Sequence, residues 1–338
     1  MHIARVFNTQ SSDLAPFSRA TSGSNLADKP TLRLGMLGFS DSQRAHVRRA
    51  IELVLHDALQ WKLGDFEQAD ARVVCGANTR LDRCTQNMAE ASLRVLAASK
   101  DEKSMMLSLR SISRPIAFSL PLHDSNIEPG LTCDVSSPAS IHLLLMQFEK
   151  CLSTRLAQFV LGKHLTQREP ELKATAYHIL HASKLIAVVD LLSFQIGLLP
   201  DADPQEFENA VWKKRPVEAA DIPHHFFPTN VVKVRWIYAQ HTRRDLLPGR
   251  YRHKYIYFRQ PPKISASWLT DAQLKILHML IERPLNLLQL VDHLGVQHED
   301  AARDLACLYF AAGVTTTASK AANALPKQEK RSVWAMLS

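Results

Sequence analysis

The chain has 338 residues, of which 46% are hydrophobic and 22% charged, so it can bury two or three domain cores without disulfide staples. Its net charge is +8, and five irregularly spaced cysteines without a CxxC pair argue against a disulfide framework and a cysteine-rich zinc site. No apolar run approaches the roughly 20 residues of a membrane span, and residues 1–30 lack the apolar stretch of a secretory signal, so we expect a cytoplasmic protein with a flexible leader over residues 1–30.

Strands and helices alternate over residues 31–122, which predicts a small parallel α/β domain. Short apolar runs mark the expected strands, at residues 32–38, 61–66, 69–76, 93–99 and 104–112. Helical spacing of apolar residues marks a helix over residues 43–59, and a polar helix fits residues 83–91. A linker follows over residues 123–137.

The order of these elements resembles the receiver domain of response regulators. In that family an acidic pair follows the first strand, an aspartate ends the third, Ser or Thr ends the fourth, and Lys-Pro follows the fifth. Here Asp41 is the only acid near the first position, the third strand ends in Cys75-Gly76-Ala77, Ser99 stands at the fourth, and Arg114-Pro115 replaces Lys-Pro. The resemblance implies a receiver-like domain without a phosphoacceptor or a metal-binding carboxylate cluster; an unrelated α/β domain is the alternative.

Residues 138–263 predict a mixed α+β region. Pro138 opens a helix whose apolar face continues to Leu161, which would cover the first domain or form an oligomer contact. β-branched residues and Gly197 favour a hairpin-like piece over residues 177–199, with a helix over 174–192 as the alternative. A short helix to Trp212 and a strand over residues 254–259 follow.

From residue 267 the pattern becomes helical. Three helices are expected over residues 270–282, 287–294 and 299–312. Thr270 and Asn286 would cap the first two, while Gly295 and Gly313 would end the last two. A wing strand over residues 314–317 completes a layout over residues 267–318 that resembles a winged-helix domain, and residues 319–338 form a polar tail.

The winged-helix resemblance implies either DNA readout by the third helix or docking of a protein partner. Glu299, Asp300 and Asp304 make that helix acidic. Because DNA phosphates repel an acidic helix, we favour a protein partner for residues 267–318.

The positive charge is concentrated in one segment. Twelve Lys and Arg residues and only three acids lie between Lys213 and Lys263. The predicted anion-binding cations surround the turn at residues 248–249 and are Arg243, Arg244, Arg250, Arg252 and Lys254. Tyr251 and Trp236 are the predicted stacking rings. This combination predicts binding of a phosphate-bearing ligand (a nucleotide second messenger such as a cyclic dinucleotide, or single-stranded nucleic acid) or an acidic partner. The alternative is a solvated basic turn whose aromatic residues are packed in a core.

Catalytic and metal-binding motifs are weak. The run at residues 162–166 resembles the end of a Walker A loop, but Ala157 stands where the motif needs glycine. The paired histidines at 178 and 181 and at 224 and 225 have no further ligand at metal-site spacing. We therefore expect a non-enzymatic regulatory or signalling protein without metal or cofactor; a DNA-binding transcription regulator and a protein adaptor are the alternatives.

Overall fold

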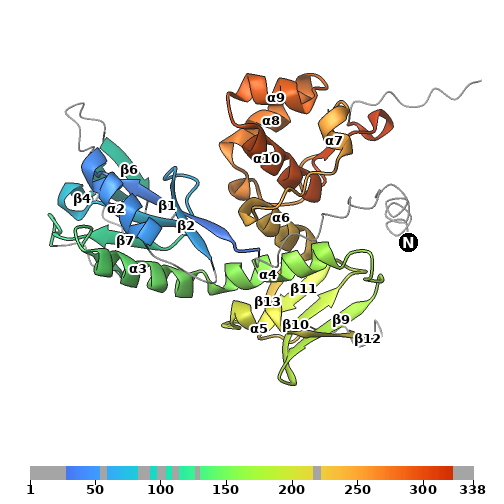
Figure 1. The fold of residues 1–338 in the computed structure, drawn as a ribbon, viewed down its shortest axis with the longest axis horizontal. Helices are drawn as coiled ribbons and strands as arrows, with labels where there is room; N and C mark the ends of the chain where they lie inside the picture. The colour runs from blue at the N-terminus through green and yellow to red at the C-terminus, as the bar shows by residue number, and fades with distance from the viewer. Residues whose placement is uncertain are drawn as a thin grey trace, which may run out of the picture.

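The computed structural model describes residues 28–53, 59–82, 92–96, 104–108, 114–125, 130–215 and 222–322 (Figure 1). Most of the predicted leader, the predicted helix at 83–91 and the tail from residue 323 lie outside these residues. Residues 28–30 of the predicted leader are fixed in place, because the Asp28 carboxylate is hydrogen bonded to Tyr238 and Thr242.

Five parallel strands form the first sheet, in the spatial order β2-β1-β3-β7-β8. They are β1 (Thr31–Leu37), β2 (Gln60–Gly64), β3 (Ala71–Val74), β7 (Ile116–Ser119) and β8 (Thr132–Cys133). Numbered along the chain this is 2-1-3-4-5, an order of doubly wound sheets in which the first and third strands flank the reversal point. The predicted parallel α/β class is therefore confirmed for this part of the chain.

The two faces of the parallel sheet are covered differently. On one face α2 (Asp41–Leu53) and α3 (Pro138–Cys151) pack through Val47, Ile51 and Phe148. The other face meets a small antiparallel sheet, which consists of β4 (Thr79–Asp82), β5 (Ser92–Leu96) and β6 (Ser104–Ser108). Val95 of β5 belongs to the small core on that face, with Val74 and Phe118.

Placing residues 93–99 and 104–112 in the parallel sheet was wrong. These segments form β5 and β6, which pair antiparallel because the connection between them is too short for a parallel crossover, which needs a dozen or more residues. Consequently Arg114-Pro115 precedes the fourth parallel strand, and Ser119 stands at its end instead of Ser99. The α/β domain also extends past residue 122, since β8 and α3 belong to it.

The long apolar stripe that begins at Pro138 serves two cores. The predicted helix is divided at Leu152 into α3 and α4 (Ser153–Gln167), which follow one another from the α/β domain toward the rest of the molecule (Figure 1). Leu156 packs in the α/β core, whereas Phe159 and Leu161 pack in the second core.

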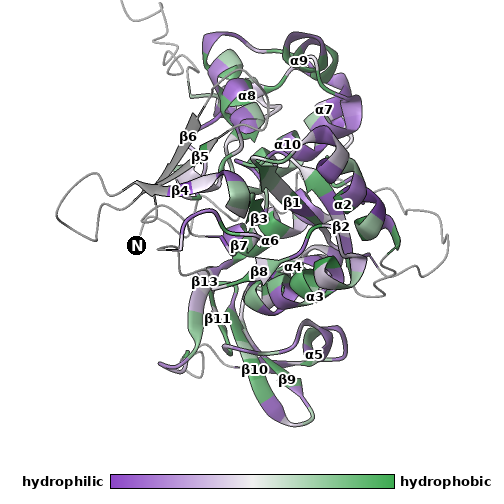
Figure 2. Ribbon diagram, turned by 90° about the vertical axis from the view of Figure 1, so that its left-hand side faces the viewer, coloured by the Kyte–Doolittle hydropathy of each residue, from purple (hydrophilic) through white to green (hydrophobic). Residues whose placement is uncertain are grey.

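A five-stranded antiparallel sheet follows α4 and projects away from the other elements (Figure 2). Its order is β12-β9-β10-β11-β13, with β9 (Ala176–His181), β10 (Lys184–Asp190), β11 (Gln195–Leu198), β12 (Val211–Arg215) and β13 (Phe227–Asn230). The hairpin prediction for residues 177–199 is confirmed. Helix α5 (Pro204–Glu208) begins at the Asp203 cap but ends before Trp212, which pairs with Ile179 in the sheet.

The C-terminal part is mainly helical. It contains α6 (Val231–His241), α7 (Arg250–His253), α8 (Asp271–Glu282), α9 (Leu287–Leu294) and α10 (His298–Phe310). Strand β14 (Tyr257–Phe258) pairs antiparallel with β15 (Val314–Thr315). The predicted caps Thr270 and Asn286 both form capping boxes, and Gly295 is left-handed as expected. After α10, however, the residue with positive φ is Ala312 instead of Gly313.

One apolar core joins the antiparallel sheet, α4, α6 and helices α8 to α10. Helix α6 lies in its middle, with Val234, Ile237 and Tyr238 fully buried. The predicted boundary between residues 138–263 and 267–318 therefore does not separate two cores. Within the described ranges, no helix combines the length and the apolar character that a membrane crossing requires.

Candidate functional site

The predicted cations of the 241–254 segment fall into two groups. Arg243 and Arg244 follow α6 and lie against the start of the α/β domain. Arg244 Nε is 3.5 Å from Asp28 Oδ2, and Arg243 Nε is 3.5 Å from Thr31 Oγ1. Both arginines are exposed, so they remain open to an acidic partner although Arg244 already has a carboxylate beside it.

The second group lies on α7 and just after it. Arg252 pairs with Asp245, and the Arg250 guanidinium lies 5.6 Å from the centroid of the Tyr251 ring. Lys254 is exposed. The hydrophilic colour of α7 is visible in Figure 2. Of the two predicted stacking rings, Tyr251 is 2% exposed and its hydroxyl donates to the Val314 carbonyl, so it is part of the core.

Trp236, the other predicted ring, is only 1% exposed but lines a cavity of about 320 Å³. The cavity lies between the first turns of α6 and the segment that leads into α8. Its walls offer two lysines, two indoles and two small polar side chains, from Lys233, Lys263, Trp236, Trp268, Asn230 and Ser265. Pro262 and Ile264 complete the lining, which contains no carboxylate.

Lys233 is the distinctive group of this cavity. Its Nζ lies 4.4 Å from the Trp268 ring centroid and 5.9 Å from that of Phe227. No carboxylate of the described residues forms an ion pair with it. Burial, and then the charge of Arg155, lower the pKa of Lys233. Two aromatic faces therefore hold a half-buried ammonium group that has no counter-ion among the described residues, although buried charges in proteins are normally paired.

Trp236 also carries a hydrogen-bond donor without a partner among the described residues. The Trp236 indole Nε1 is buried and has no partner within the part of the chain that the structure describes. Trp236 meets Trp268 edge-on, with ring centroids 5.8 Å apart. A buried N–H without a partner costs about 1–3 kcal/mol. Because Nε1 has almost no surface open to the cavity, the contribution of Trp236 to the wall is its apolar ring.

Arg155 connects this cavity to the α/β domain. Its guanidinium carbon lies 5.1 Å from the Trp268 ring centroid, and its Nη1 is 2.7 Å from Asp70 Oδ1. Asp70, 4% exposed, lies just before β3 and also accepts a hydrogen bond from the Arg33 amide at 2.9 Å. His241 Nε2 lies 3.6 Å from the same Asp70 oxygen that binds Arg155.

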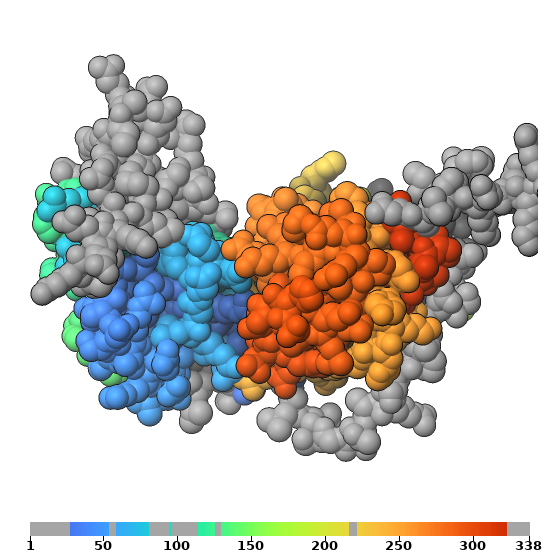
Figure 3. Space-filling model, turned by 90° about the horizontal axis from the view of Figure 1, so that it is seen from above, coloured from blue at the N-terminus to red at the C-terminus, as the bar shows by residue number. Residues whose placement is uncertain are grey.

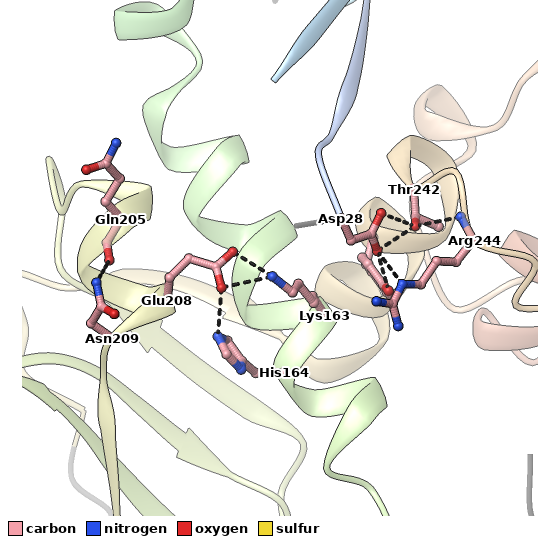
Figure 4. Close-up of polar contacts among 9 residues, drawn as sticks. Asp28, Lys163, His164, Gln205, Glu208, Asn209, Thr242 and Arg244 are labelled. Carbon is pink, nitrogen blue, oxygen red and sulfur yellow. Dashed lines mark hydrogen bonds and ion pairs between the residues drawn. The ribbon is translucent and has the colours of Figure 1, made fainter. Parts of the chain in front are cut away.

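The other end of α6 is clamped to the start of β1. His241 Nδ1 lies 2.9 Å from the Thr31 carbonyl oxygen, and the Tyr238 hydroxyl donates to Asp28 at 2.7 Å. The Thr242 hydroxyl donates to the same carboxylate (Figure 4). Burial lowers the pKa of His241, so this imidazole is held neutral at the contact. Since α6 has eleven residues and spans about 16 Å, one short rigid helix joins the cavity to the α/β domain.

A second polar cluster is accounted for by packing. Lys163 Nζ lies 2.7 and 2.8 Å from the two Glu208 oxygens, and His164 Nε2 lies 3.7 Å from one of them (Figure 4). These contacts join α4 to α5. Lys163, the lysine of the run resembling a Walker A loop, is thus a buried, paired structural cation. Among the residues that the structure describes, no group of three His, Cys, Asp or Glu side chains could hold a metal ion.

Sequence reasoning identified the basic segment but missed the cavity within it. Lys233 and Lys263 were counted among the twelve cations, yet nothing in their spacing sets them apart. Trp268 and Arg155 lie outside the segment altogether. The available signal was that Trp236 follows Lys233 and Trp268 follows Lys263 within a few residues, which does not reveal that these side chains converge. No family model, curated protein or solved structure matches this chain.

Proposed function

We propose that this protein is a non-enzymatic regulatory protein that binds a small phosphate-bearing ligand in the Lys233 cavity. The observation that supports this most strongly is the half-buried Lys233 ammonium group, which is held by Phe227 and Trp268 and has no carboxylate partner in the part of the chain that the structure describes. Anionic oxygen is the natural partner for such a group, because charge-assisted hydrogen bonds are roughly twice as strong as neutral ones.

The remaining groups suit a phosphate that carries an organic part. Lys263, Ser265 and Asn230 supply further polar contacts, while Trp268 supplies an aromatic wall. The volume of about 320 Å³ is near the lower end of the ~300–1,000 Å³ typical of small-molecule sites. This size favours one nucleotide unit or a smaller phosphate over a whole cyclic dinucleotide.

The C-terminal layout supports a docking or relay role in this proposal. Strand β14, helices α8 to α10 and strand β15 follow a winged-helix-like order, and Ile256 forms a bridge with Leu285 between α8 and α9. In this arrangement α10 would be the recognition helix. It is instead buried on most sides, with Ala302, Leu305 and Cys307 in the core, which argues against insertion of α10 into a DNA groove.

The exposed pair Arg243 and Arg244 supports a second candidate, in which the basic segment contacts single-stranded nucleic acid or an acidic protein. Such a contact would be strongly salt-dependent if phosphates are bound. All four described cysteines are free thiols, which suits a reducing compartment such as the cytoplasm.

Calorimetric titration tests the cavity proposal, with pyrophosphate, GMP and cyclic di-GMP as probes. The Lys233→Met variant keeps the apolar stem against the two rings but removes the charge. We expect it to lose about tenfold or more in affinity, because a hydrogen bond to a charged group is worth about 1.5–3 kcal/mol. Lys275→Met, which removes the same charge from an exposed position on α8, should bind like the wild type.

Equal affinity of Lys233→Met and the wild type for every probe that binds would contradict the cavity proposal. If the Arg243→Ala/Arg244→Ala variant lost binding while Lys233→Met bound normally, the ligand would bind at the exposed arginine pair instead of in the cavity.

A further inference from the structure

Asp70 is a buried carboxylate that is linked to the cationic cavity through its contacts. It does not line the cavity, yet it is joined to the cavity through one residue: Arg155 donates to Asp70 Oδ1 at 2.7 Å and lies 5.1 Å from the centroid of the Trp268 ring. Lys233 lies 4.4 Å from the same centroid. Two cations thus approach one indole, and within the described ranges only Arg155 is paired with a carboxylate.

The Asp70–Arg155 pair is also a contact between two parts of the protein. Asp70 belongs to the α/β domain and exchanges backbone and side-chain hydrogen bonds with Arg33 of β1. Arg155 belongs to α4. The space-filling view from above shows the α/β domain and the C-terminal helices in contact along a seam (Figure 3). The Asp70–Arg155 pair therefore joins the α/β domain to α4, and Arg155 joins it to the cavity wall. A structural change at the cavity would reach the α/β domain through this pair.

We infer that Asp70 and a phosphate-bearing ligand in the cavity compete for the positive charge of Arg155, so that ligand binding weakens the contact between the α/β domain and α4. This inference rests on the proposed function, because it requires an anion in the cavity. Arg155 does not line the cavity, so its charge acts on the ligand from behind the wall, beside the Trp268 ring that Lys233 also approaches. Asp70 is the carboxylate that offsets this charge when the cavity is empty.

The sign of the coupling follows from electrostatics. A negative charge at Asp70 lowers the positive potential that an anion meets in the cavity, so removing that charge raises the affinity. By thermodynamic reciprocity, the factor by which Asp70 lowers the affinity for the ligand equals the factor by which the ligand weakens the Asp70–Arg155 contact. Couplings of this kind are typically 5–150-fold.

Calorimetric titration with pyrophosphate measures both sides of this competition. Asp70→Asn, which is isosteric and uncharged, should bind pyrophosphate at least about fivefold more tightly than the wild type. Arg155→Gln should bind at least about fivefold more weakly. Adding Asp70→Asn to Arg155→Gln should then change the affinity by less than about twofold, because the effect of Asp70 acts through Arg155.

Glu208→Gln is the matched control. It also removes one carboxylate charge that is paired with a cation of α4, but its partners are Lys163 and His164. His164 packs near Trp212, whereas Arg155 packs on Trp268 of the cavity wall. Its affinity for pyrophosphate should equal that of the wild type. Thermal melting shows whether each variant is folded.

Amide hydrogen exchange of the wild-type protein gives a readout that needs no variant. The Arg33 amide donates to Asp70 Oδ2, so saturating pyrophosphate should speed its exchange if the Asp70 contact loosens. Unchanged exchange of the Arg33 amide in the saturated protein, or unchanged affinity of a folded Asp70→Asn variant while Lys233→Met has lost binding, overturns the inference and leaves the proposed function intact. Absence of any binding by the wild type overturns both.

Discussion

Gly162 of α4 lies directly against the backbone of α6: a Cβ atom at this position would stand 2.2 Å from the Val234 carbonyl oxygen. It would also stand 2.9 Å from the Tyr238 Cβ. No other residue allows the two helices to approach so closely. This crossing fixes α6, and with it Lys233 and Trp236, relative to α4 and Arg155.

Gly162→Ala is therefore expected to destabilise the protein. Alanine would gain up to about 1 kcal/mol from helix propensity, but backbone crowding in a packed core typically costs ~1–3 kcal/mol and is severe here. We expect a net loss of about 2 kcal/mol in urea denaturation. Gly249→Ala is the control, because a Cβ there meets no atom within 4 Å and the residue has φ −51. A stable Gly162→Ala variant would show that the helices can separate.

Ala312 should be replaceable by glycine with a gain in stability. It follows α10 with φ 59, a conformation that costs an L-residue about 1–2 kcal/mol. Glycine avoids this cost, but it loses more conformational entropy on folding than alanine does, which cancels part of the gain. We expect Ala312→Gly to raise the free energy of unfolding by about 0.5 kcal/mol. Gly295→Ala, at φ 64 with open space around it, should change stability in the opposite direction by about 1 kcal/mol. Changes of the same sign in both would contradict this explanation.

Asp304 gives the stability a specific pH dependence. Burial raises its pKa to about 6, against the opposing hydrogen bond from Gln273 and the charges of Arg33 and Arg303. Because this pKa exceeds the ~3.9 of an unfolded aspartate, its stabilising contribution is complete below pH ~3.9 and is lost as the pH rises through 6.

Asp304→Asn keeps an acceptor for Gln273 and removes the charge. We expect the variant to exceed the wild type in unfolding free energy by ~1–3 kcal/mol at pH 8, and by clearly less at pH 5. Urea denaturation at the two pH values measures this difference. An advantage that does not depend on pH would mean that Asp304 titrates at its ordinary value.

Trp268 should report occupancy of the cavity. Its ring lies beside Lys233 and Arg155, so a bound anion changes the field at the indole and with it the fluorescence emission. We expect pyrophosphate to change the emission of the wild type, and Trp268→Phe to lose most of that change. Trp212→Phe should retain it, since Trp212 lies in β12 and packs against Tyr177. Retention of the full signal by Trp268→Phe would place the anion elsewhere.

The exposed arginines should be dispensable for the cavity ligand. Arg243 and Arg244 do not line the cavity, so the Arg243→Ala/Arg244→Ala variant should bind pyrophosphate within about twofold of the wild type. If the pair contacts single-stranded DNA, the same variant should flatten the dependence of log affinity on log salt by about 1.4, because each neutralised phosphate contributes ~0.7. Anisotropy of a labelled oligonucleotide at several salt concentrations measures this slope.

Local rules predicted much of the fold. Leu32, Leu34 and Met36 mark β1 because a parallel strand is covered on both faces and reads as an apolar run. Thr270 and Asn286 identified two helix starts through capping chemistry that involves only neighbouring residues. The antiparallel pairing of β5 and β6 was not predicted, because a short apolar strand has the same appearance in either kind of sheet.

The candidate site was predictable only as a region. The excess of cations in residues 213–263 includes Lys233, but the value of Lys233 to a ligand depends on its partial burial and on its two aromatic neighbours, neither of which the sequence shows. The Asp70–Arg155 contact spans 85 residues and two cores. Trp236 is an example. Its position among cations in the sequence predicted an exposed ring for stacking, whereas in the structure helix α6 buries the ring, and only the part that lines the cavity can contact a ligand.

The bond between Asp28 and Thr242 has a consequence for synthesis of the chain. The two residues are 214 positions apart, so at ~5–20 residues per second roughly 10–40 s separate their appearance on the ribosome. During that interval all strands of the parallel sheet have been synthesised and can fold. Tyr238 and Thr242, which bind Asp28 just before β1, have not yet been synthesised. The junction must therefore close last, onto a domain that has already formed, and the Asp28 carboxylate stays solvated until α6 arrives to bury it.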